Sequence, residues 1–240
     1  MYWITWRRGR RSASPPPSDP GGANRRGFPR QTRVAPGRRR LILAAPLALA
    51  TLAAPARGEA AMPAPAATIE SFYSTLLAVM KESRRVPFDQ RYQQLRPAIE
   101  RAFNLVLMTR IAVGPQWTEF TPDQQQRLET AFSRYTIATY TNRFDSYSGE
   151  RFAVDPNPVA NPNGTIIETR LIPADGPPIS LNYLMRQGAG GQWQVIDVYL
   201  SGTISELATR RAEFASVLRQ QGPEGLVRLL DQRAAALRTG

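Results

Sequence analysis

The chain has 240 residues, with no cysteine, no histidine and a formal net charge of +12. The lack of these two residue types excludes a disulfide framework, a lipid-anchoring cysteine, the common zinc sites and the Ser-His and Cys-His nucleophile pairs. The charge alone would suit a nucleic-acid partner. However, residues 1–60 hold twelve Arg against Asp19 and Glu59 and carry +10 of that charge. The rest of the chain is nearly neutral, so we expect no nucleic-acid partner.

The first 60 residues are typical of an export leader. Residues 1–40 are rich in Arg, Pro, Gly and Ser and have too little apolar surface to fold. The apolar run at 41–56 follows three arginines and is too short, and too interrupted by proline, for a good spanning helix. It fits the apolar part of a cleavable signal peptide, with small residues before a cut at 54–56 or 58–60. We therefore expect export to the periplasm; a retained membrane anchor is the alternative.

The signal would be more compact if the chain began near Val34, because the stretch before the apolar run is unusually long. We hypothesise that the true start lies later than Met1.

Residues 61–240 are predicted to form one domain, since a chain of about 180 residues buries roughly 70% of its unfolded surface without help from disulfides. Its first half has helical periodicity. Helices are expected from Thr68, from Pro87 or Phe88, over 98–113, and from Pro122 to about Tyr147. The last of these starts with a capping box formed by Thr121 and Gln124.

The period then changes to two, which indicates strands. Strands are expected at 151–154, 165–172, 179–187 and 192–200, followed by helices at 204–220 and 223–238 around the Gly222–Pro223 break. Helices, then strands, then helices indicate an α+β fold rather than alternating βαβ units. We expect a curved four-stranded antiparallel sheet with the N-terminal and C-terminal helices packed on its concave face.

Few residues could carry catalysis. The single lysine, Lys81, lies on the polar side of the first helix, and no glycine-rich phosphate loop with lysine follows a strand. Asp197 lies in an otherwise apolar strand, where burial would raise its pKa and suit a general base beside Tyr183 or Tyr199. The alternative is a structural carboxylate that fixes the turn at Ser201–Gly202. A lone acid favours the structural interpretation, so we expect no catalytic residue, no metal and no cofactor.

Residues 191–230 carry the most specific pattern. Within this range the pattern consists of Trp193, Asp197, Gly202, Arg211, Glu213, Phe214, Gly222, Gly225 and Leu226. Three residues earlier in the chain extend it: Gly114 and Trp117 after the third helix and Gly149 before the first strand. This ordered set resembles the MlaC-type periplasmic lipid carriers, the auxiliary substrate-binding proteins of a lipid ABC transport system. The stretches at 136–152 and 202–214 look most like the hopanoid-associated branch, often labelled HpnM.

The resemblance implies a nuclear-transport-factor-2-like layout with an apolar cavity between sheet and helices. It also implies three partners: a membrane lipid of phospholipid or hopanoid type, an inner-membrane ABC transporter complex, and an outer-membrane lipoprotein complex. The cavity candidates are apolar or aromatic: Phe72, Leu76, Phe103, Leu107, Ile111, Phe132, Tyr135, Tyr140, Phe144, Leu181, Tyr183 and Val195. For each of them alone, ordinary core packing is the competing interpretation. Arg143 and Arg151 are candidates for contact with a phosphate headgroup.

The leading hypothesis is therefore a soluble periplasmic lipid carrier that shields acyl or other apolar parts of its cargo. Two alternatives stay open. One is an isomerase-like enzyme of the same fold that uses Asp197 on a small hydrophobic substrate. The other is a ligand-free adaptor of a transport or hopanoid-biosynthesis complex.

Overall fold

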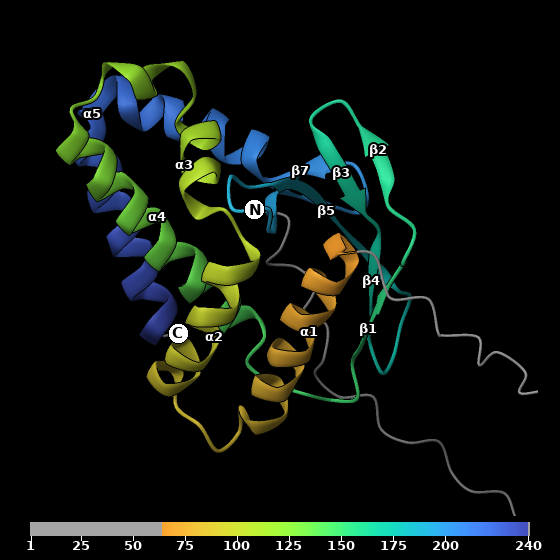
Figure 1. Cartoon of the computed structure of the whole chain (residues 1–240). Coiled ribbons are helices and arrows are strands. Elements are labelled where there is room, and N and C mark those ends of the chain that lie inside the picture. The colour runs from red at the N-terminus through yellow and green to blue at the C-terminus, as the bar shows by residue number, and fades with distance from the viewer. Residues whose placement is uncertain (1–63, 240) are drawn as a thin grey trace, which may run out of the picture. The chain divides into compact units, whose positions relative to one another are not determined.

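The computed structural model describes residues 64–239 (Figure 1). The predicted leader, signal peptide, cleavage site and start lie outside these residues. Five α-helices are present in the described part: α1 Ala64–Glu82, α2 Phe88–Ala102, α3 Leu105–Val113, α4 Pro122–Arg143 and α5 Glu206–Thr239. A 3-10 helix at Gly114–Glu119 joins α3 to α4. None of the helices in this range is long and apolar enough to cross a membrane.

The strands form one antiparallel sheet: β1 Arg151–Val154, β2 Val159–Asn161, β3 Gly164–Ile167, β4 Thr169–Ile172, β5 Ile179–Gln187, β6 Trp193–Leu200 and β7 Ile204–Ser205. Strand β5 is central. β3 and β4 pair one after the other along one of its edges, and β6 pairs along the other. The outer positions are taken by β1 beside β4, β2 beside β3 and the short β7 beside β6.

The α+β class and the antiparallel sheet are confirmed, but the expected count of four strands is wrong, because the sheet has seven. The predicted strand at 165–172 is interrupted at Glu168, whose carbonyl accepts a hydrogen bond from Asp155 N instead of continuing the ladder (2.9 Å). β2 was missed because Pro158 and Pro162 flank it. β7 takes Ile204 and Ser205, which were assigned to the following helix.

The helices differ from expectation at the start of α1, which is Ala64 rather than Thr68, and at a break between α2 and α3. A helix over 98–113 was predicted, whereas α2 continues through Pro97 to Ala102 and α3 begins at Leu105. Phe103 is extended and forms a bridge with Val195 of β6, and Asn104 N donates to Val195 O at 2.9 Å. The chain therefore leaves the helix in order to pair with the sheet. Asn104 then caps α3, its side chain accepting from Leu107 N.

The capping box at the start of α4 is confirmed, but this helix ends at Arg143 rather than near Tyr147. The two predicted C-terminal helices form one element that kinks at Gly222, where φ is 65° and ψ is −172°. This positive φ is one that glycine adopts at little cost.

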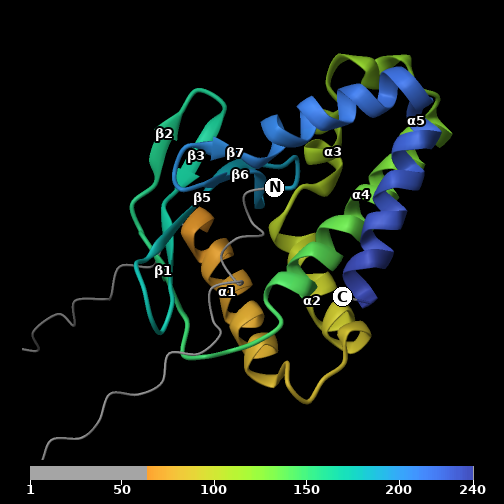
Figure 2. The ribbon, with the colours of Figure 1, turned by 180° about the vertical axis from the view of Figure 1, so that it is seen from behind.

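The kink divides α5 into two arms with different neighbours. Figures 1 and 2 show the first arm crossing from the sheet over α3 and the second arm running beside α4. In both views α1 lies between the sheet and α2, and it contacts α2, β1 and β6. Helix α1 therefore packs against both the sheet and α2.

Candidate functional site

An aromatic cluster fills the space between the sheet and the helices. Phe72 of α1 lies 5.2 Å from Phe103 and 5.5 Å from Tyr140 of α4, measured between ring centroids. Phe103 also meets Tyr140 at 5.4 Å and Tyr183 of β5 at 6.2 Å. Most of these contacts are edge-to-face, a favoured geometry for aromatic pairs. Elements far apart in the sequence thus converge on one apolar interior.

Tyrosine hydroxyls lie inside this cluster. Tyr73 donates to the hydroxyl of Tyr183 (3.0 Å), and its oxygen lies 2.7 Å from Oγ1 of Thr169. Thr169 in turn donates to the carbonyl of Leu181. The hydroxyl of Tyr140 interacts with that of Tyr183. Burial raises the pKa of Tyr73, Tyr140 and Tyr183, so these groups are neutral hydrogen-bonding groups and not bases.

The predicted cavity residues fall into three groups. Phe72, Phe103, Tyr140, Phe144 and Tyr183 meet in the aromatic cluster. Leu76, Leu181 and Val195 are buried in the same core. The others lie on the helices outside the cluster: Phe132 packs on Phe214 of α5, Tyr135 meets Arg210, and Leu107 and Ile111 are partly buried on α3.

Sequence reasoning missed Tyr73 and Phe152, whose rings stack at 4.2 Å within the cluster. Tyr73 could have been found from its spacing of four residues from the buried Ile69. The signal for Phe152 is weaker, because its strand is only four residues long.

A second group of side chains lies where α4 meets α5. Tyr135 of α4 is flanked by Arg210, whose guanidinium carbon is 4.8 Å from the ring centroid. Arg210 pairs with Glu206 at 3.6 Å, and Arg233 pairs with Glu213. Burial alone would raise the pKa of Tyr135, but the positive charges of the three arginines 210, 233 and 143 lower it overall. We call Arg143, Arg210, Arg233, Tyr135, Glu206 and Glu213 the cationic cluster.

Arg143, one of the two predicted headgroup contacts, belongs to this cluster. Burial lowers its pKa, and the nearby Glu206 opposes that effect. The other candidate, Arg151, is exposed on β1 and lies outside the cluster.

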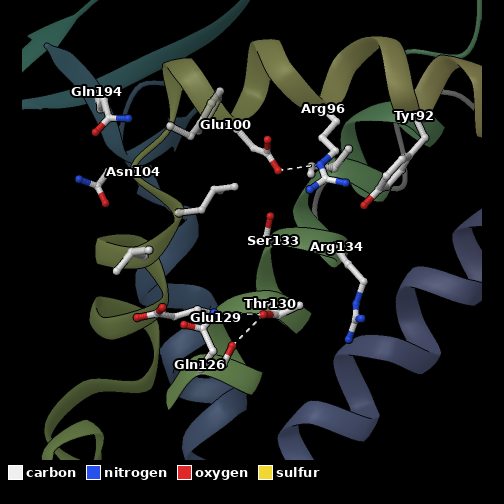
Figure 3. Close-up of a pocket in the computed structure, with 14 residues that line it drawn as sticks. Tyr92, Arg96, Glu100, Asn104, Gln126, Glu129, Thr130, Ser133, Arg134 and Gln194 are labelled. Atoms are coloured by element: carbon white, nitrogen blue, oxygen red, sulfur yellow. Dashed lines mark hydrogen bonds and ion pairs between the residues drawn. The ribbon is translucent and has the colours of Figure 1, made fainter. Parts of the chain in front are cut away.

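A groove of about 680 Å³ opens between α2, the start of α3 and α4 (Figure 3). Polar side chains line most of it, and Figure 3 shows the Arg96–Glu100 ion pair of α2 facing Ser133 and Thr130 of α4. Of the predicted cavity residues it contains only Phe103. The groove is therefore mainly polar, and it meets the aromatic cluster at Phe103.

Asp197 holds the junction between the sheet and α5. Its Oδ1 accepts from Val198 N at 2.7 Å and from Leu207 N at 3.1 Å, and its Oδ2 accepts from Ser205 Oγ at 2.5 Å. Burial raises its pKa, and these three hydrogen bonds oppose that rise. The contacts are those of a carboxylate that caps the first turn of α5.

Two of the motif positions meet in space. Gly114 has a φ of 79°, and a Cβ built there would lie 2.8 Å from Nε of Arg211. A side chain at this position would therefore collide with the arginine. Nearby, Arg110 lies over the ring of Trp117 at 5.6 Å. The contact between Gly114 and Arg211 therefore joins the turn after α3 to the first arm of α5.

Other motif positions shape α5 or the sheet edge. Phe214 is buried against Phe132, Gly222 forms the kink, and Gly202 turns the chain between β6 and β7 with a φ of 79°. Trp193 begins β6 and is partly buried. These residues stabilise the fold rather than line a site.

Within residues 64–239 no group of three or more carboxylate, histidine or cysteine side chains could hold a metal ion.

Residues 70–232 match the family described as "MlaC protein". A solved structure with a similar fold is the phospholipid-binding protein from Ralstonia solanacearum, determined in complex with a phospholipid. The two chains are 27% identical, the match covers 73% of this chain and 99% of that one, and the TM-score is 0.63. Because the family match extends over most of the chain, this protein belongs to the MlaC family.

Proposed function

We propose that this protein is a periplasmic carrier that takes a phospholipid from one membrane or membrane complex to another, with its acyl chains shielded between the sheet and the helices. The main observation in favour of this proposal is the similarity to the phospholipid-bound Ralstonia protein over almost all of that chain. The aromatic cluster supports the same proposal, because it provides an apolar interior bounded by α1, α4 and β5.

The physical need for such a carrier follows from hydration. Each methylene moved from an apolar environment into water costs about 0.8 kcal/mol, so a sixteen-carbon chain costs roughly 12 kcal/mol. Unassisted transfer through water is correspondingly slow. A protein interior that replaces the membrane removes most of this cost. It must also release the lipid, so moderate rather than maximal affinity is expected.

Entry of a lipid requires the aromatic rings to separate, because Phe72, Phe103 and Tyr183 are almost completely buried against their neighbours. We propose that the packed cluster is the empty state of the carrier. Phe103 is suited to a change of position, since it lies in the two-residue break between α2 and α3 rather than inside a helix.

The test is to purify the protein from its own periplasm and to analyse it by native mass spectrometry and lipid extraction. We expect one co-purified phospholipid per chain, and uptake of labelled phospholipid from vesicles by the delipidated protein. A protein that is empty when isolated and takes no lipid from vesicles would overturn the proposal. Export is checked in the same experiment by recovery in the periplasmic fraction.

A matched pair of variants locates the site. Phe103→Ala removes a ring of the aromatic cluster, and Leu230→Ala truncates an equally buried side chain on the second arm of α5 instead. We expect phospholipid retention to change at least several-fold more in Phe103→Ala than in Leu230→Ala. Equal effects would assign the lipid to a different part of the molecule.

The alternative cargo is a hopanoid-type lipid, favoured by the likeness of residues 202–214 to the hopanoid-associated branch. The same extraction distinguishes the two, because a hopanoid and a phospholipid differ in mass. The proposed partners, an inner-membrane ABC transporter complex and an outer-membrane lipoprotein complex, would be tested by crosslinking in intact cells.

A further inference from the structure

Three arginines converge on one phenol at the junction of α4 and α5. Tyr135 and Arg143 are eight residues apart on α4, which places them two turns apart along the same side of the helix. Arg210 comes from the first arm of α5 and Arg233 from the second, and both interact with Tyr135. Side chains from three helical segments are thus directed at one place.

The cluster is positively charged and only partly accessible to solvent. Its three arginines are accompanied by two carboxylates, Glu206 and Glu213. The side chains of Arg210 and Glu206 are 14% and 20% exposed. Charges at such a site are screened less than those on an open surface, so the excess positive charge favours an anion.

The guanidinium of Arg210 is oriented by aromatic rings. It lies 4.8 Å from the ring centroid of Tyr135 and 6.0 Å from that of Phe132. Its ion pair with Glu206 measures 3.6 Å, which is longer than the roughly 2.7–2.9 Å of a close charge-assisted hydrogen bond. An oriented guanidinium with such a loose ion pair is suited to bidentate binding of a phosphate.

This cluster borders the aromatic interior. Arg143 follows Tyr140 on α4 by three residues, less than one helical turn. Tyr140 contacts Phe72, Phe103 and Phe144, so it belongs to the apolar side. Positive charge and apolar interior are therefore adjacent, as the phosphate and the acyl chains are in a phospholipid.

We propose that the cationic cluster binds the phosphate of the lipid headgroup, through Arg210, and makes the carrier selective for phosphate-bearing lipids. This inference rests on the proposed carrier function. It assigns the cargo to the anionic, phosphate-containing class and separates it from neutral lipids with the same hydrocarbon.

The test compares two labelled lipids with identical acyl chains, phosphatidylglycerol and diacylglycerol, each offered in phosphatidylcholine vesicles to the delipidated full-length mature protein. We expect wild type to take up phosphatidylglycerol at least tenfold better than diacylglycerol, the discrimination that one or two charge-assisted hydrogen bonds provide. Arg210→Gln should reduce phosphatidylglycerol uptake about tenfold and leave diacylglycerol uptake unchanged.

Two further variants keep the result interpretable. Arg228→Gln changes an exposed arginine on the second arm of α5, outside the cluster, and should behave as wild type. Arg210→Lys keeps the charge but loses the planar guanidinium group that binds a phosphate bidentately. Its phosphatidylglycerol uptake should lie between that of wild type and that of Arg210→Gln. Circular dichroism verifies that each variant is folded.

Three results would overturn the inference. One is equal uptake of both lipids by wild type, and another is an equal loss in Arg210→Gln and Arg228→Gln. The third is binding of inorganic phosphate that depends on Arg210 while phosphatidylglycerol uptake does not, because the cluster would then serve free phosphate. Failure of wild type to take up either lipid would instead remove the carrier function itself, so the two failures are distinguishable.

Discussion

The two sides of α4 are held in different ways. Toward the sheet and α1, Tyr140 and the following Phe144 take part in the aromatic cluster. Toward the second arm of α5, the contact contains the buried Leu226 and Leu230. Two ion pairs lie beside them, Arg127 with Glu224 and Arg134 with Asp231. We call this second contact the α4–α5 seam.

The difference matters because apolar burial and exposed ion pairs stabilise to different extents. A fully buried aromatic side chain contributes about 1.5–3 kcal/mol through hydration alone, whereas an exposed ion pair contributes roughly 0–1 kcal/mol. Opening the aromatic interior to a lipid therefore needs replacement apolar contacts, which acyl chains supply. The ion pairs of the seam add little stability individually and depend on salt.

The largest effect is expected from removing a ring at the centre of the interior. Phe72→Ala should lower the free energy of unfolding by about 3–5 kcal/mol, because Phe72 is 2% exposed and contacts three other rings. Urea denaturation measures the loss, with Val159→Ala on the exposed edge strand as a control. A loss below 1 kcal/mol would show that the interior is loosely packed.

Alkaline pH should weaken the same region. The unfolded tyrosines titrate near the ordinary value of 10.0, whereas burial raises the folded pKa of Tyr73, Tyr140 and Tyr183. The folded state therefore holds protons that the unfolded state releases. Stability is unaffected well below pH 10 and falls above it, by up to roughly 1.4 kcal/mol per pH unit for each tyrosine.

Denaturation at a series of alkaline pH values, followed by tyrosine absorbance, measures this slope. Tyr183→Phe should make it shallower, and Val159→Ala, which leaves every tyrosine in place, should leave it unchanged. An equal slope in wild type and Tyr183→Phe would contradict the assigned burial.

An intermediate effect is expected where the sheet meets α5. Asp197→Asn keeps the size of the side chain but loses its charge, so the hydrogen bonds from Val198 N, Leu207 N and Ser205 weaken. We expect unfolding to become easier by about 1–3 kcal/mol in urea, with the lipid content unchanged. Asp175→Asn in an exposed turn is the control. Unchanged stability together with lost turnover of a small hydrophobic substrate would favour the enzymatic alternative instead.

Local signals explain which parts of this architecture could be predicted from the sequence. The capping box of Thr121 and Gln124 and the break at Gly222 depend on neighbouring residues, and both are present. The break at Phe103–Asn104 and strand β7 depend on pairing with β6 and have no local signature. The helical pattern around Phe103 therefore suggested a continuous helix that the sheet interrupts.

The same distinction applies to the candidate site. Buried aromatic residues were recognised from their spacing, but their separation into an interior group around Phe103 and an outer pair of Phe132 with Phe214 depends on helix packing. Arg143 was selected by residue type alone. Its neighbours Arg210 and Arg233 come from about 70 and 90 residues further along the chain, and only tertiary structure brings them together.

The smallest effect is expected in the α4–α5 seam. Arg134→Gln and Asp231→Asn each remove one ion pair whose side chains are 50% and 41% exposed, so each should cost less than about 1 kcal/mol. The double variant should lose little more than either single variant, because both changes remove the same interaction. Raising the salt concentration should shrink the loss, since exposed charges are screened within roughly 10 Å at 0.1 M salt. A salt-independent loss above 2 kcal/mol would mean that the pair is effectively buried, and the seam would then be held as firmly as the aromatic interior.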